Sequence, residues 1–149
     1  MDIKQLITEY LESARLMQVA TAKDNQPWVC TVYFAYDDKL NLYWLSKPER
    51  RHSQEIAINE KVAGTIVLPH TPGDEVRGIQ FQGIAKKLEK QDGEHGLKTY
   101  ATRMKMGEER KKKIQDGTDG HMVYHIKPTL FVLFDEKNFP DNPRQEYKM

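Results

Sequence analysis

The 149-residue sequence has a single cysteine, Cys30, and no apolar run close to the length of a membrane span. One thiol can neither form an internal disulfide nor supply a thiolate metal cage, which excludes a disulfide scaffold and a structural zinc module. A bilayer-spanning helix needs ~20 consecutive apolar residues, so no membrane partner is expected. The lone cysteine and the absence of a signal-peptide pattern after Met1 favour the cytoplasm.

The sequence also lacks an excess of charge of either sign. Its 23 Lys and Arg residues nearly balance 22 Asp and Glu residues, and the formal net charge is +1. Nucleic-acid-binding domains usually carry a net positive field, so no nucleic acid partner is expected and any anion site must be local. The weakest hypothesis left open is a nucleic-acid interface on Lys86, Lys87, Lys111, Lys112 and Lys113.

The patterns that are present predict one α+β domain over residues 1–149. Apolar residues at helical spacing predict a helix over 3–16. Runs rich in β-branched and aromatic residues around short turns predict a hairpin of 17–22 and 28–36 and a strand over 40–45. The remaining expectations are a helix over 47–60, strands over 62–68, 76–88, 121–126 and 130–134, a helix around 97–104, a charged connector over 107–120, and a polar surface tail from Asp135. Gly78 and Gly83 mark expected bulges or close backbone approaches. About six strands without regular βαβ alternation predict a sheet that closes into a small barrel.

The segment 46–53 carries the strongest chemical signal. Ser46 and Glu49 fit a capping box with a proline between them, so a helix is predicted to begin just after Ser46. A helix N-terminus favours acidic residues, yet this one opens with Lys47, Arg50, Arg51 and His52. A bound phosphate would reverse this mismatch. Spacing alone leaves open the alternative of a solvated basic turn compensated by nearby glutamates.

Aromatic side chains precede this segment on the predicted strands, namely Trp28, Tyr33, Phe34, Tyr43 and Trp44. Side chains of this kind suit a flat hydrophobic ring. A ring site next to a phosphate site predicts a nucleotide-like cofactor.

The order of these features resembles the pyridoxamine 5'-phosphate oxidase-like FMN-binding split-barrel superfamily. That order is a helix, a hairpin, a strand ending in Leu45-Ser46, a helix opening with Arg51-His52, and the strand 77–83 with the sequence Arg-Gly-Ile-Gln-Phe-Gln-Gly. The chain looks most like a small bacterial branch with an Arg-Gly-(Val/Ile)-Gln-Phe-x-Gly strand, and the resemblance extends to about Phe134. It implies an α+β fold with an antiparallel six-stranded split β-barrel and flanking helices, FMN as the cofactor, and a homodimer.

The resemblance also implies which residues contact FMN. The family's phosphate-binding basic pair falls on Arg51 and His52, with histidine where lysine is usual, and Lys47 and Arg50 are expected to assist. The pair at the strand end falls on Leu45 and Ser46. The strand that would meet the isoalloxazine edge through backbone groups comprises Val29, Cys30, Thr31, Val32, Tyr33 and Phe34. Gln80 and Gln82 lie on the strand that usually faces the flavin across the dimer.

The C-terminus departs from the true oxidases. Residues 141–149 lack the Arg-Leu-x-Pro-type segment that helps to hold the vitamin substrate, so this substrate is not expected. Relatives of the fold use FMN, a deazaflavin or haem, and the fold alone does not choose the chemistry. Two hypotheses stay open: an FMN-dependent oxidoreductase of unknown substrate, and a non-catalytic protein that binds or senses flavin or haem.

Two further candidates are expected to be structural. His121 and His125 would lie roughly 13 Å apart on a strand, too far to share one metal ion. Cys30 has no identifiable base and is expected to be a small buried residue of the hairpin.

Overall fold

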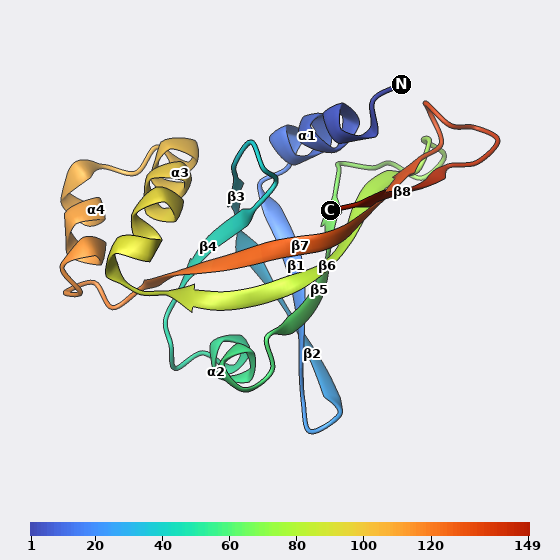
Figure 1. Cartoon of the computed structure of the whole chain (residues 1–149). Helices are drawn as coiled ribbons and strands as arrows, with labels where there is room; N and C mark the ends of the chain where they lie inside the picture. The colour runs from blue at the N-terminus through green and yellow to red at the C-terminus, as the bar shows by residue number, and fades with distance from the viewer.

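A single antiparallel sheet curls into a half-barrel in the computed structural model, which describes residues 1–149 (Figure 1). The strand order is β2-β1-β5-β6-β7-β4-β3, and β8 pairs with β7. The strands are β1 Leu16–Lys23, β2 Gln26–Tyr33, β3 Ala35–Tyr36, β4 Leu42–Ser46, β5 Lys61–Val67, β6 Arg77–Leu88, β7 Met122–Asp135 and β8 Arg144–Lys148. The predicted α+β split-barrel class is confirmed, with eight strands instead of six.

Four α-helices and one short 3-10 helix flank the sheet (Figure 1). They are α1 Ile3–Ser13, α2 Arg51–Ile58, η1 Lys90–Gly93, α3 Glu94–Met104 and α4 Glu108–Gln115. Asp2 caps α1, because its Oδ1 accepts hydrogen bonds from the backbone N–H groups of Lys4 and Gln5. The predicted first helix was three residues too long, since Leu16 already pairs with Tyr33 in β1. No helix has both the length and the apolar character that crossing a membrane requires.

The main core fills the concave side of the sheet. Its 22 buried residues include Ile7 and Leu11 of α1, Trp44 and Phe131 of the sheet, and Phe34 between β2 and β3. A smaller core on the opposite face joins the sheet to α3 and α4 through five buried residues, Tyr43, Leu88, Leu97, Ile114 and Val123. The second core explains why the helices of the 90–115 region lie outside the half-barrel (Figure 1).

The predicted irregularity at Gly83 is present in the long β6–β7 pairing. The register shifts between Gln82 and Gly83, and a Cβ on Gly83 would come within 2.5 Å of the carbonyl oxygen of Lys127. The residue opposite is Pro128, which has no N–H to donate, so the shift lets β7 accommodate a proline. Gly78 keeps a regular register, and no bulge occurs there.

Two expectations for the C-terminal part were wrong. The connector 107–120 contains α4, whose first turn is acidic and whose last turn is basic, as the helix dipole favours. The predicted strands 121–126 and 130–134 are the single strand β7, since Pro128 interrupts the pattern without ending the strand. The tail from Asp135 lies on the surface as expected, and in addition it forms β8, which pairs with β7 from Leu130 to Phe134.

Candidate functional site

The helix after β4 begins at Arg51, not just after Ser46. Arg50 occupies the N-cap position and no side chain caps the helix, so the predicted capping box between Ser46 and Glu49 is absent. The hydroxyl of Ser46 is already engaged, because it contacts His52 and accepts a hydrogen bond from Ser53. Of the four predicted cations, only Arg51 and His52 lie in the first turn of α2.

The guanidinium of Arg51 is fixed on two sides. Its Nε donates to Oε2 of Glu55 at 2.7 Å, one helical turn further on, and its Cζ lies 3.8 Å from the ring centroid of Trp28 on β2. Oε1 of Glu55 accepts a hydrogen bond from Thr21 of β1 at 2.8 Å. The hairpin β1–β2 and α2 therefore meet at this guanidinium.

Glu55 partly offsets the charge mismatch at the helix start. The carboxylate is only 4% exposed, and hydrogen bonds from Arg51 and then Thr21 lower the pKa of Glu55. The Arg51 side chain is 47% exposed, and only its Nε is bonded within the chain. The residue lines a cleft of about 350 Å³ that only polar side chains surround, namely Lys23, Asp24, Gln26, Gln54 and Glu55. Two terminal nitrogens of a guanidinium are thus available for an anion.

His52 points to a different neighbour. Its Nε2 lies 2.9 Å from Oγ of Ser46, which also accepts a hydrogen bond from Oγ of the buried Ser53 at 3.1 Å. Burial and the positive charge of Arg50 lower the pKa of His52 below its ordinary value, so the imidazole is neutral at pH 7. When Nε2 of the neutral ring accepts a hydrogen bond from the Ser46 hydroxyl, the ring carries its proton on Nδ1, where it can be donated to a ligand.

Strand β2, predicted to meet a flavin ring, is an edge strand of the sheet. Its side chains alternate, so Val29, Thr31 and Tyr33 face outward while Cys30 and Val32 pack against the main core. Because β2 pairs only with β1, half of its backbone N–H and C=O groups are free along the other edge. Burial raises the pKa of Cys30 to about 11, so the thiol is protonated and a poor nucleophile.

The other predicted residues lie apart from the basic pair. Gln80 and Gln82 lie on the outer face of β6 and share a shallow cavity of about 460 Å³ with Val29 of β2. Leu45 packs against the smaller core, and Lys47 and Arg50 stand in the turn before α2. The predicted set is therefore divided between a basic cleft at α2 and the outer face of the sheet, and one chain alone does not bring the two parts together.

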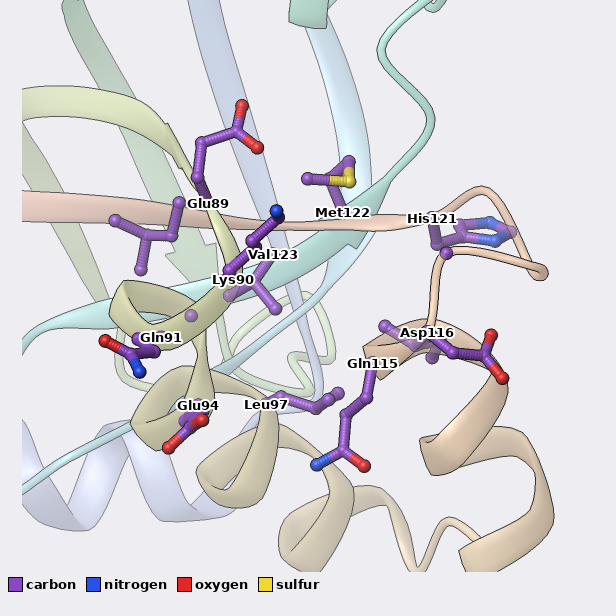
Figure 2. A pocket seen from close by; sticks show the side chains of 14 residues that line it. Glu89, Lys90, Gln91, Glu94, Leu97, Gln115, Asp116, His121, Met122 and Val123 are labelled. Carbon is purple, nitrogen blue, oxygen red and sulfur yellow. The ribbon is translucent and has the colours of Figure 1, made fainter.

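A different cleft, about 620 Å³ in volume, opens where β7 begins, beside α3 and α4 (Figure 2). It contains none of the predicted cofactor residues. Its acidic side chains Glu89, Glu94 and Asp116 come from three segments and do not point toward one another (Figure 2). His121 on its rim contacts Asp119 through Nδ1 at 2.5 Å, whereas His125 contacts Asn41, so the two histidines serve separate local contacts.

Two residues of the basic site, Thr21 and Ser53, were not predicted from the sequence, and Glu55 was expected only as one of the glutamates that compensate a solvated basic turn. The i,i+4 spacing of Arg51 and Glu55 on one helix was a usable signal for their ion pair. Thr21 and Ser53 gave no comparable signal, because their partners lie on other elements.

Comparison with known families shows which family this chain belongs to. The family model described as pyridoxamine 5'-phosphate oxidase matches residues 3–131. The UPF0306 protein of Pasteurella multocida (strain Pm70) is 27% identical over 97 residues, which cover 64% of this chain. The matched stretch spans 65% of that relative's own length.

Solved structures show the same fold at low identity. The conserved hypothetical protein Rv2991 of Mycobacterium tuberculosis is similar with a TM-score of 0.77 and 19% identity, covering 94% of this chain and 88% of that one. A FAD-binding protein of Mesorhizobium loti is similar with a TM-score of 0.67 and 21% identity, and the match covers 85% of this chain and 88% of that one. HutZ, the haem storage protein of Vibrio cholerae, is similar with a TM-score of 0.62 and 21% identity, and the match covers 86% of this chain and 91% of that one. The fold is thus shared by proteins named for different cofactors.

Proposed function

The chain belongs to the pyridoxamine 5'-phosphate oxidase family, and on that premise we propose that it is a homodimeric FMN-binding flavoprotein that acts as an oxidoreductase. The observation that carries the proposal is Arg51, which Glu55 and Trp28 hold in place while its terminal nitrogens face a polar cleft. A guanidinium placed in this way can bind a phosphate through two parallel hydrogen bonds.

The residues around α2 fit the phosphate end of FMN. Arg51 would supply the permanent charge, and the Nδ1–H of His52 would donate to a second phosphate oxygen. Ser46 acts behind His52, because its hydroxyl holds the imidazole through Nε2. Lys47 and Arg50 lie in the adjoining turn and would add positive charge at the mouth of the site.

The β2 edge fits a flat heteroaromatic ring. Residues 29–33 present free backbone donors and acceptors, which can pair with the ring's carbonyl and N–H groups. When bound, the isoalloxazine would supply the hydride or electron transfer, while the protein orients the ring and excludes water.

A second copy of the chain is part of the proposal. Val29 and Tyr33 are each 58% exposed and lie on an edge strand, which leaves apolar surface in contact with water. Gln80 and Gln82 lie too far round the sheet to join the Arg51 cleft within one chain, so they would meet the flavin of the partner subunit. We propose a cytoplasmic location, which suits the single unpaired thiol.

The test is a titration of apoprotein with FMN, riboflavin and haem, followed by visible absorption and by sedimentation. FMN should bind more tightly than riboflavin, with one FMN per chain in a dimer. Equal affinity for FMN and riboflavin would contradict the phosphate site. Steady-state oxidation of a reduced nicotinamide by the loaded protein separates an oxidoreductase from a flavin storage or sensing protein, which would bind without turnover.

A further inference from the structure

The most spacious of the described cavities lies at the mouth of the half-barrel, beneath α2. It has a volume of about 770 Å³, within the range of small-molecule sites, and barrel mouths are a common place for such sites. One wall is α2, through Ser53, Ile56 and Ala57, and the other is the paired end of β6 and β7. Only Gln54 is common to this cavity and the Arg51 cleft, so the two lie on different sides of α2.

The side chain of Tyr124 forms part of the lining of this cavity. The Tyr124 side chain is 2% exposed, lies in β7 and stacks on Trp44 with ring centroids 5.3 Å apart. It lines the cavity, and its hydroxyl, which is not bonded to any residue of the chain, is open to the cavity. A phenolic hydroxyl that is not bonded within the chain can donate a hydrogen bond to an acceptor placed in the cavity.

The rest of the lining combines apolar surface with positive charge. Ile56 and Ala85 are buried beside Tyr124, and Ala57 and Ile58 extend the apolar wall toward solvent. The charged lining residues are Glu60, Lys61, Lys86 and Lys87, and of the three lysines only Lys87 forms an ion pair, with Glu89 outside the cavity. Two ammonium groups are therefore uncompensated next to an apolar wall.

We propose that the half-barrel mouth is a second ligand site, which binds a small organic carboxylate with an apolar or aromatic body. The apolar body would pack on Ile56, Ala85 and the ring of Tyr124. The carboxylate would lie toward Lys61 and Lys86, and one of its oxygens would accept a hydrogen bond from the Tyr124 hydroxyl. This site goes beyond the proposed FMN function and does not depend on it.

The structure supplies a spectroscopic reporter for the test. Trp28 and Trp44 are the two tryptophans, and Trp44 stacks directly on the cavity residue Tyr124. In a Trp28→Phe background, 4-phenylbutyrate should change the fluorescence of Trp44 and bind measurably by calorimetry in FMN-free protein. The neutral match, 4-phenylbutyramide, has the same apolar body and should bind roughly fivefold more weakly at low salt.

Variants locate the binding to the cavity. Lys61→Gln with Lys86→Gln should remove most of the difference between carboxylate and amide, whereas Lys4→Gln on the exposed side of α1 should change neither. Tyr124→Phe keeps the ring against Trp44 and should weaken the carboxylate severalfold. Ala57→Trp should abolish binding by filling the mouth.

Four results would overturn the proposal. They are no binding of 4-phenylbutyrate at millimolar concentration, equal affinity for the acid and its amide, binding that Ala57→Trp leaves intact, or a double lysine variant indistinguishable from Lys4→Gln. Because the titrations use FMN-free protein, none of these results bears on the flavin proposal.

Discussion

Arg51 and His52 are adjacent in sequence, but they occupy contrasting environments at the start of α2. Arg51 leans toward the β1–β2 hairpin, where a buried carboxylate and an indole face hold it. His52 turns toward the end of β4, where two buried serine hydroxyls replace the carboxylate. The Arg51 side chain is charged and paired with a carboxylate, whereas the His52 side chain is neutral at pH 7 and has no acidic partner.

This difference shows how the first turn of a helix can hold an arginine and a histidine without electrostatic repulsion between the two side chains. An ion pair anchors the permanent charge, so the ligand meets a guanidinium with a fixed orientation. The hydroxyl chain behind His52 supplies no charge, so burial keeps the imidazole neutral until an anion arrives. The two sides therefore predict different responses to mutation and to pH.

The largest expected effect comes from removing Arg51. Arg51→Ala should weaken FMN roughly 10- to 150-fold, because charge-assisted hydrogen bonds contribute about 1.5 to 3 kcal/mol, and it should leave riboflavin unchanged. The measurement is the Kd of both flavins by absorption titration. The double variant Arg51→Ala with Glu55→Gln removes the buried carboxylate that would otherwise lose its partner. An equal loss for FMN and riboflavin in the double variant would show that Arg51 does not contact phosphate.

Removing the carboxylate that orients Arg51 should have a smaller effect. Glu55→Ala leaves the guanidinium free to rotate, and FMN should bind about tenfold more weakly, because the hydrogen bond that orients the charged group is lost. Glu55→Gln keeps an acceptor for Arg51 and should lose less. Tighter FMN binding by Glu55→Ala would show that the carboxylate competes with the phosphate instead of positioning Arg51.

The anchoring of Arg51 also illustrates what sequence can and cannot predict here. The antiparallel α+β fold, the position of β6 and the irregularity at Gly83 follow from alternation and glycine placement, which act locally. The start of α2 was predicted wrongly because Ser46 is a residue type that often caps helices, but in the folded chain its hydroxyl contacts His52 and Ser53 instead. Contacts such as Thr21 to Glu55, 34 residues apart, depend on how the hairpin packs on α2. No spacing rule reaches that far.

His52 should make both stability and FMN affinity depend on pH, in opposite directions. Its pKa in the folded protein is lowered, so the unfolded chain takes up a proton more readily as pH falls below 6.5. The free energy of unfolding of the apoprotein should therefore be highest above pH 6.5 and fall as pH drops through the lowered pKa. His125 also has a lowered pKa, so His52→Gln should remove only part of this dependence.

Bound FMN should shift the pKa of His52 in the opposite direction, because a phosphate stabilises the imidazolium and so raises its pKa. Affinity for FMN should strengthen as pH falls below 6.5, while affinity for riboflavin stays flat. Titrations with both flavins between pH 5 and 8 check the predicted pH dependence of affinity. Chemical denaturation of the apoprotein over the same pH range checks the predicted pH dependence of stability. A flat FMN profile would place His52 away from the phosphate.

The smallest effect should come from Ser53, which touches His52 only through Ser46. Ser53→Ala removes a buried donor to Ser46 Oγ and should cost about 0.5 to 1.5 kcal/mol of unfolding free energy. Ser46 can still give its proton to Nε2 of His52, so FMN affinity should change less than about threefold. Ser13→Ala, which removes an exposed bond to a helix carbonyl in α1, is the matched control and should change neither quantity. If Ser53→Ala weakened FMN as much as Arg51→Ala does, the hydroxyl chain and not the ion pair would be the main determinant of phosphate binding.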